Sequence, residues 1–150
     1  MRVMEIESRD YDSGKTLLGS KFELFVTRPS NSAVFYATLG FEIVNQKEGG
    51  YTTLRNGDVV IALSPVPRVL PLNWLWFLRH PPIGTEIVLY TDRLNELRER
   101  LKAAGYKPGN IKQQLWGDKD FRITDHDGYY IRVSEGAPIS NQEKPHLTSR

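Results

Sequence analysis

One order of predicted elements occurs twice in this chain: a strand, a helix and then three strands. The first helix ends at Leu39-Gly40-Phe41 and the second at Ala104-Gly105-Tyr106, which are similar tripeptides in corresponding places. Each half alone is too small to bury both faces of a sheet, so the two halves are expected to pack together. The chain is therefore predicted to be an α+β protein built from two βαβββ modules.

The first module has clear helix and turn signals. Its helix is expected from Ser32 to Leu39, with Ser30 or Asn31 as the N-cap and Gly40 after the end. Asn56-Gly57 is a strong signal for a two-residue hairpin. The strands of this module are predicted at residues 21–27, 41–44, 51–54 and 58–63.

The second module repeats the pattern. Asp92 is expected to cap its helix, which ends at Gly105. The apolar residues of this helix recur at helical spacing and predict one buried face: Leu94, Leu97, Leu101 and Ala104. Strands are predicted at residues 85–91 and 111–115, and a strand pair within residues 115–135.

The closing strand pair is joined by a polar turn. Phe121 and Ile123 alternate with Arg122 and Thr124, which is the two-residue period of a half-buried strand. The segment Asp125–Gly128 then interrupts the pattern, and its glycine suits the positive φ of a tight turn. In such a turn, Asp125 and Asp127 are expected to accept hydrogen bonds from backbone N–H groups.

The order Trp116-Gly117, Asp120-Phe121 and Asp125–Gly128 before the last strand resembles a known family. It resembles the closing strands of the vicinal oxygen chelate superfamily, which includes glyoxalase I, the bleomycin-resistance proteins and the extradiol dioxygenases. Residues 35–41 and 84–87 support the resemblance, and the bleomycin-resistance-like branch is the most similar. The resemblance implies two modules, 21–63 and 85–135, whose curved mixed sheets surround a cleft. Within the 21–135 domain, residues 64–84 are expected to connect the two modules. Residues 1–20 are expected to form an arm before the domain, and residues 136–150 a loosely ordered tail after it.

Composition excludes several kinds of function. The net charge is only +2 with no run of basic residues, so no nucleic-acid partner is expected. The absence of cysteine excludes disulfides, thiol nucleophiles and Cys-ligated zinc. No apolar stretch approaches the ~20 residues of a membrane span, and the N-terminus is too acidic for a signal peptide. A cytoplasmic location is therefore expected.

The resemblance also indicates where a metal would bind. The metal-binding positions of the superfamily fall on Lys21, Glu86 and Arg132, and on an apolar strand of the first module that offers no ligand. Two of these side chains are cations, and a hard metal needs several oxygen or nitrogen ligands. No metal and no other cofactor are therefore expected. The histidines lack ligand spacing and are expected on the surface: His80, His126 and His146.

Aromatic residues are concentrated near the expected cleft. Their ordinary role is packing, but they also suit a stacking wall for a flat or amphipathic ligand. The candidate ligand-binding residues are the polar side chains at the metal-equivalent positions together with four aromatic ones: Lys21, Glu86, Arg132, Tyr51, Trp74, Trp76 and Trp116. The apolar connector around Trp74 and Trp76 also favours a homodimer.

Two main functional hypotheses follow. The first is a metal-independent protein that sequesters a small molecule, for which the cations Lys21 and Arg132 favour a neutral or anionic aromatic ligand. The second is a lyase, isomerase or dioxygenase that uses a divalent metal with Glu86 as ligand or base. A structural or partner-binding module on the same fold is a third possibility, so the sequence leaves enzymatic activity open.

Overall fold

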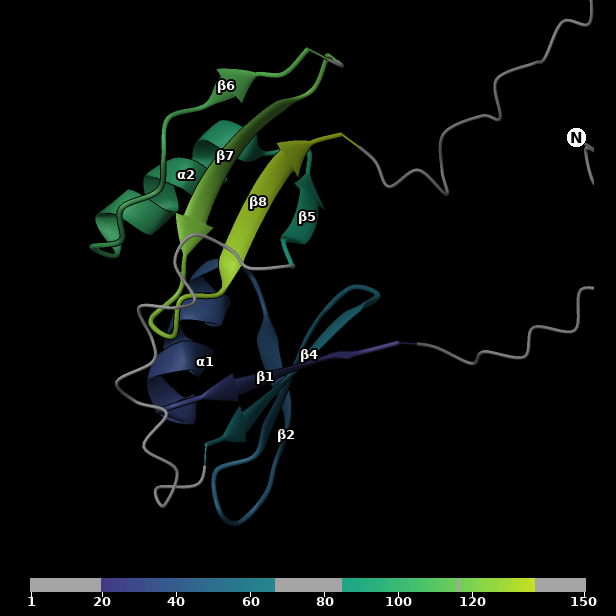
Figure 1. The fold of residues 1–150 in the computed structure, drawn as a ribbon, viewed down its shortest axis with the longest axis vertical. Helices are drawn as coiled ribbons and strands as arrows, with labels where there is room; N and C mark the ends of the chain where they lie inside the picture. Colours follow the sequence, from purple (N-terminus) through teal and green to yellow (C-terminus); the bar gives the residue numbers. More distant parts are fainter. Residues whose placement is uncertain (1–19, 67–84, 116, 137–150) are drawn as a thin grey trace, which may run out of the picture.

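The computed structural model describes residues 20–66, 85–115 and 117–136. It forms two successive modules, each with one helix and four strands (Figure 1). The elements in chain order are β1 Phe22–Val26, α1 Pro29–Thr38, β2 Glu42–Gln46, β3 Thr52–Asn56, β4 Val59–Pro65, β5 Ile87–Thr91, α2 Leu94–Ala103, β6 Lys112–Gln113, β7 Lys119–Thr124 and β8 Tyr130–Glu135. The predicted arm and tail, and most of the connector, lie outside the described residues.

The two sheets have the same topology. Their strand orders are β1-β4-β3-β2 and β5-β8-β7-β6. In each sheet the first strand of the module pairs in parallel with the last, and the other pairs are antiparallel. The first strands of the two modules begin at Phe22 and Ile87, and their helices begin at Pro29 and Leu94. The two pairs of starts have the same spacing in sequence, so the modules correspond residue by residue over this part. The prediction of two mixed-sheet βαβββ modules is thus confirmed.

The helix starts differ from the sequence prediction. Helix α1 begins at Pro29, earlier than predicted, because proline suits the first turn, where its missing N–H costs nothing. Neither helix has a side-chain cap, so Asp92 does not cap α2. Instead, the Thr91 hydroxyl accepts a hydrogen bond from the Arg93 N–H, 3.0 Å away. Both helices end before glycines of positive φ, 94° at Gly40 and 88° at Gly105, as predicted.

Buried apolar residues of both modules form one hydrophobic cluster. Helix α1 packs on β3 and β4 and contributes Phe35 and Tyr36, while α2 packs on β8 and contributes Leu97 and Leu101. The predicted face of α2 is correct except at its end, because Ala104 is exposed. Since one cluster spans both sheets, the two modules share a single core.

The turn between β7 and β8 joins the modules. Asp125 Oδ1 accepts hydrogen bonds from the Asp127 and Tyr129 N–H groups, both at 2.9 Å, as predicted for this turn. Asp125 Oδ2 accepts a third from the Tyr36 hydroxyl of α1 at 3.0 Å. Asp127 Oδ1 accepts one from the Thr27 N–H at 2.9 Å. The turn therefore closes its own loop and also binds the first module, beside α1 (Figure 1).

Burial affects the protonation of this turn. It raises the pKa of the Asp125 carboxyl above its ordinary value, although hydrogen bonds from Tyr129, Tyr36 and Asp127 act in the opposite direction. Burial also raises the pKa of the Tyr36 hydroxyl, which therefore stays protonated as the donor to Asp125. The contact between the modules is thus a buried, hydrogen-bonded carboxyl group.

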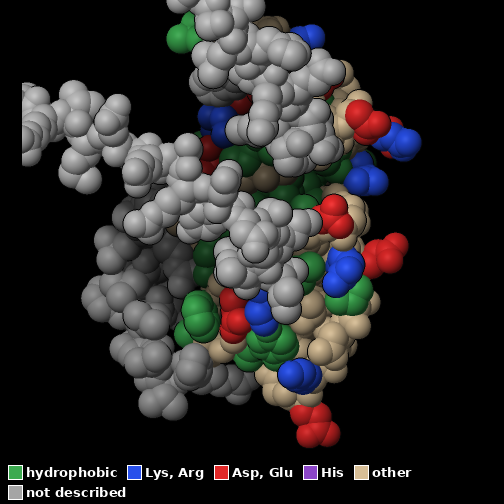
Figure 2. All heavy atoms as spheres, turned by 90° about the vertical axis from the view of Figure 1, so that its right-hand side faces the viewer, with side chains coloured by type: hydrophobic (Ala, Val, Ile, Leu, Met, Phe, Trp, Pro, Cys, Tyr) green, Lys and Arg blue, Asp and Glu red, His purple; other side chains and the backbone are tan. Residues whose placement is uncertain are grey.

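Hydrophobic side chains also reach the surface, and Figure 2 shows some of them among charged side chains of both signs. The outer strands of the first sheet, β1 and β2, carry several of them. Phe25 is 53% exposed, and Ile43 and Val44 are 55% and 52% exposed. Apolar side chains on edge strands are a common feature of association surfaces.

Candidate functional site

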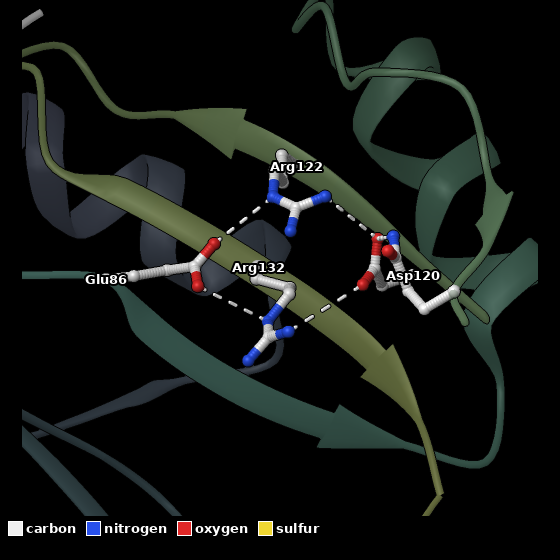
Figure 3. A network of polar contacts seen from close by, with 5 residues as sticks. Glu86, Asp120, Arg122 and Arg132 are labelled. Atoms are coloured by element: carbon white, nitrogen blue, oxygen red, sulfur yellow. Dashed lines mark hydrogen bonds and ion pairs between the residues drawn. The ribbon is translucent and has the colours of Figure 1, made fainter. Parts of the chain in front are cut away.

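Four charged side chains form a ring of ion pairs on the second sheet (Figure 3). Arg122 on β7 and Arg132 on β8 are directly paired in the antiparallel register. Asp120 lies two residues before Arg122, so the two-residue period of the strand places it on the same face. Glu86, just before β5, completes the ring from the other side.

The two carboxylates alternate with the two guanidinium groups. Glu86 Oε1 lies 3.2 Å from Arg122 Nε, and Glu86 Oε2 lies 3.4 Å from Arg132 Nε. Asp120 Oδ1 lies 3.2 Å from Arg122 Nη1, and Asp120 Oδ2 lies 3.9 Å from Arg132 Nη1. Like charges opposite one another destabilise a strand pair, so the two carboxylates offset the repulsion between the arginines.

The ring is deeply buried on one side and accessible on the other. The Asp120 side chain is only 1% exposed and also accepts a hydrogen bond from Gln114 Nε2 at 2.8 Å. By contrast, 29% of the Glu86 side chain and 33% of the Arg122 side chain are exposed. Asp120 therefore anchors the ring, and Glu86 and Arg122 present it to solvent.

Lys21 belongs to a separate cluster. It lies just before β1 as Glu86 lies just before β5, so the two residues are equivalent in the two modules. Lys21 Nζ donates a hydrogen bond to the Tyr51 hydroxyl at 2.8 Å and lies 3.6 Å from Glu23 Oε2. The hydrogen bond to Tyr51 raises the pKa of the Lys21 ammonium group. A second ammonium, that of Lys47, lies 5.6 Å from the centre of the Tyr51 ring.

The first sheet has no counterpart of the ring. Thr53 and Ala62 pair on β3 and β4 as Arg122 and Arg132 pair on β7 and β8, at equivalent positions of the two modules. Neither Thr53 nor Ala62 carries a charge. The ring is therefore a feature of the second module that the fold itself does not require.

The comparisons with known proteins identify the family. A family model of the glyoxalase/bleomycin resistance protein/dioxygenase superfamily matches residues 20–133, most of the chain. The chain belongs to this superfamily. No curated protein sequence matches it significantly. Within the described ranges, neither α1 nor α2 has the length and apolarity needed to cross a membrane.

The solved structures that are similar to this chain include two proteins whose names refer to bleomycin. The bleomycin resistance determinant encoded on transposon Tn5 is 23% identical, with a TM-score of 0.61 over 79% of this chain and 98% of that chain. A bleomycin-binding protein complexed with bleomycin is also 23% identical, with a TM-score of 0.59 and the same coverage. TnmS3, an antibiotic-binding protein from Streptomyces sp. CB03234, is 19% identical, with a TM-score of 0.62 over 82% and 98% of the two chains. These TM-scores show a shared fold.

The residues at the positions where the superfamily resemblance implies metal ligands do not suit a metal ion. Lys21 and Arg132 are cations, and the Glu86 carboxylate faces two guanidinium groups. In the part of the chain that the structure describes, no three His, Cys, Asp or Glu residues come together as a ligand group. His126 was expected on the surface, and its side chain is exposed. A divalent cation at the ring would compete with both arginines for the same carboxylate oxygens.

The structure brings together some of the predicted site residues and separates others. Glu86 pairs with Arg132, whereas Lys21 pairs with Tyr51 and Glu23. The predicted stacking residues Trp74, Trp76 and Trp116 lie outside the described residues.

Sequence reasoning missed two members of the ring, Asp120 and Arg122. The alternation of residues 119–124 already placed both on one face, opposite the apolar Phe121 and Ile123. The turn at residues 125–128 sets the strand register, which brings Arg122 opposite Arg132. Two arginines facing each other would have indicated that carboxylates were needed nearby.

Proposed function

We propose that this superfamily member is a metal-independent protein that binds and sequesters a small aromatic or amphipathic molecule. The ion-pair ring is the observation that carries the proposal. At two positions that the superfamily resemblance assigns to metal ligands, it sets the Arg132 guanidinium group against the Glu86 carboxylate. Fixed side-chain charges thus stand where an ion would otherwise bind.

The ring is suited to a polar group on a flat ligand. A guanidinium group has five N–H donors in one plane, and each arginine of the ring uses only some of them on carboxylates. Arg122 is 33% exposed, so its guanidinium group is within reach of a ligand carbonyl or carboxylate. A neutral or anionic aromatic ligand fits this chemistry better than a cationic one.

The solved relatives support a binding role. One of them is a bleomycin-binding protein in complex with bleomycin, and another is an antibiotic-binding protein. This chain shares their fold at low identity, so its own ligand has to be inferred from its own residues. We propose the same kind of role, capture of a small molecule, with a ligand matched to the ring. A cytoplasmic homodimer remains our expectation for the assembled protein.

A ligand screen and a metal analysis test the proposal together. Thermal unfolding would be followed against matched anionic, neutral and cationic aromatic compounds, because a ligand that binds the native state raises Tm. We expect the anionic or neutral members to raise Tm, and Arg132→Gln to weaken the effect more than Lys102→Gln, a control on the outer face of α2. About one divalent ion per purified chain, whose removal by a chelator abolishes activity, would contradict the proposal.

A further inference from the structure

A second hollow lies between the modules, away from the ion-pair ring. It is a groove of about 400 Å³, which is within the size range of small-molecule sites. One wall comes from the end of α1 and the β3–β4 hairpin, and the other from β5 and α2. None of the four ring residues lines it. The groove is therefore separate from the site proposed above.

Two polar groups from different modules meet at the mouth of the groove. A Cβ atom added at Gly40 would lie 3.1 Å from Asn56 Nδ2 and 3.7 Å from Arg100 Nη2. The Arg100 guanidinium of α2 thus reaches across to the end of α1, next to the Asn56 amide. Gly40 leaves room for both groups because it has no side chain.

The charges lining the groove have a positive excess. Arg93, Glu96 and Arg100 are its charged residues, and Arg93 and Arg100 are two helical turns apart, about 10 Å along α2. Arg93 has only a 3.9 Å contact with Asp92, and both side chains are largely exposed, so this pair is weak. Arg100 forms no ion pair with any described residue within 4.0 Å, although Glu96 is four residues before it.

The groove also has an apolar floor. Phe41 and Leu97 line it and are buried, Leu89 is half-buried, and the three charged side chains are exposed. Tyr90, which is 40% exposed, adds an aromatic side chain. An apolar floor with a few polar groups at its edge is the usual composition of a small-molecule site. We propose that this groove is a second binding site, for a small organic anion whose carboxylate or sulfonate is held by Arg100 and whose flat apolar body lies on this floor.

Arg100 also has a structural role that the test must separate from binding. It lies at the C-terminal end of α1, where a positive charge interacts favourably with the helix dipole. Replacing it will therefore cost some stability with or without a ligand. A pair of probes that share a ring system and differ in charge distinguishes the two roles.

The probes are 1-anilinonaphthalene-8-sulfonate, which is an anion, and N-phenyl-1-naphthylamine, which lacks the sulfonate. Fluorescence titration of the full chain would give a Kd for each. We expect Arg100→Gln to raise the Kd of the sulfonate about fivefold, the size of one partly exposed charge contact, and to change that of the neutral probe less than twofold. Glu96→Gln should lower the sulfonate Kd, because Glu96 is the one acidic side chain among the described residues that line the groove.

Lys102→Gln is the matched control. It removes one positive charge from the same helix, at a residue that pairs with Glu99 and does not line the groove. Amide NMR shifts of the wild-type protein place the probe independently of any variant, with Gly40 and Leu97 as reporters. Equal effects of Arg100→Gln and Lys102→Gln, or sulfonate-induced shifts at Arg122 and Arg132 in place of Gly40 and Leu97, would overturn the inference.

Discussion

Arg122 on β7 and Arg132 on β8 are direct partners in the antiparallel register, although both side chains are cations. Asp120 and Glu86 make this pairing tolerable, one from the buried side and one from the exposed side. Removing either carboxylate leaves the two guanidinium groups facing each other with only one negative charge to offset their repulsion. Because Asp120 is buried and Glu86 is partly exposed, we expect Asp120 to matter more for stability and Glu86 more for ligand binding.

Asp120→Asn should destabilise the protein. The side chain is 1% exposed and contacts both arginines and Gln114, so losing its charge leaves two partly buried cations poorly paired. We expect the free energy of unfolding, measured by urea denaturation at pH 7, to fall by about 1–3 kcal/mol. Glu99→Gln is the control, because its ion pairs with Arg98 and Lys102 are on the surface. Equal losses in the two variants would show that Asp120 contributes no more to stability than a surface carboxylate.

Glu86→Gln should remain folded and bind ligands differently. The Glu86 side chain is 29% exposed, so its loss costs less than that of Asp120. Neutralising it gives the ring a net positive charge, which should strengthen binding of anionic aromatic compounds relative to neutral ones. The change in Tm produced by matched anionic and neutral compounds measures this. If Glu86→Gln instead releases a stoichiometric divalent ion from the protein, Glu86 is a metal ligand and our proposal is wrong.

Asp125 should make stability depend on pH in an unusual direction for a carboxylate. Its pKa is raised in the folded state, so between the ordinary value of 3.8 and the folded value the native state binds more protons than the unfolded state. This contribution to stability is present at low pH and is lost as pH rises through the folded pKa. Asp125→Asn does not titrate and still has an oxygen for the Asp127 and Tyr129 N–H groups.

The difference in unfolding free energy between wild type and Asp125→Asn isolates this effect. Above the ordinary pKa of 3.8, we expect this difference to shift steadily in favour of the variant and then to level off. Urea denaturation at a series of pH values measures it, with Asp92→Asn, a largely exposed carboxylate, as the control. A shift in the opposite direction would mean that the hydrogen bonds from Tyr36 and the turn outweigh burial.

The protein is expected to be a homodimer at tens of micromolar, the range in which moderately stable contacts persist. The apolar connector, with Trp74 and Trp76, and the exposed apolar residues of β2 are the two candidate contact regions. Sedimentation equilibrium of the wild type, Trp76→Ser and Ile43→Lys would distinguish them, since only a change at the contact should favour dissociation. A monomeric wild type at these concentrations would contradict the expectation.

The amino-acid sequence by itself determined the architecture, through signals between residues that are close together in the chain. Strand periods, the Asn56-Gly57 hairpin and the glycines at the helix ends depend on residues close in sequence, so two βαβββ modules could be predicted. The helix starts were the local exception. The proline at position 29 extended α1, and α2 begins without the side-chain cap that was expected from Asp92.

The ring and the contact between the modules were decided only by the tertiary structure. The family resemblance placed Glu86 and Arg132 at metal-equivalent positions. The pairing of Glu86 with Arg122, however, depends on the order of β5, β8 and β7 in one sheet. Likewise, the turn signal around Asp125 predicted its local hydrogen bonds, but not the one from Tyr36, which lies 89 residues away. Periodicity and turn chemistry act over a few residues, whereas these partners meet only when both sheets and their shared core have formed.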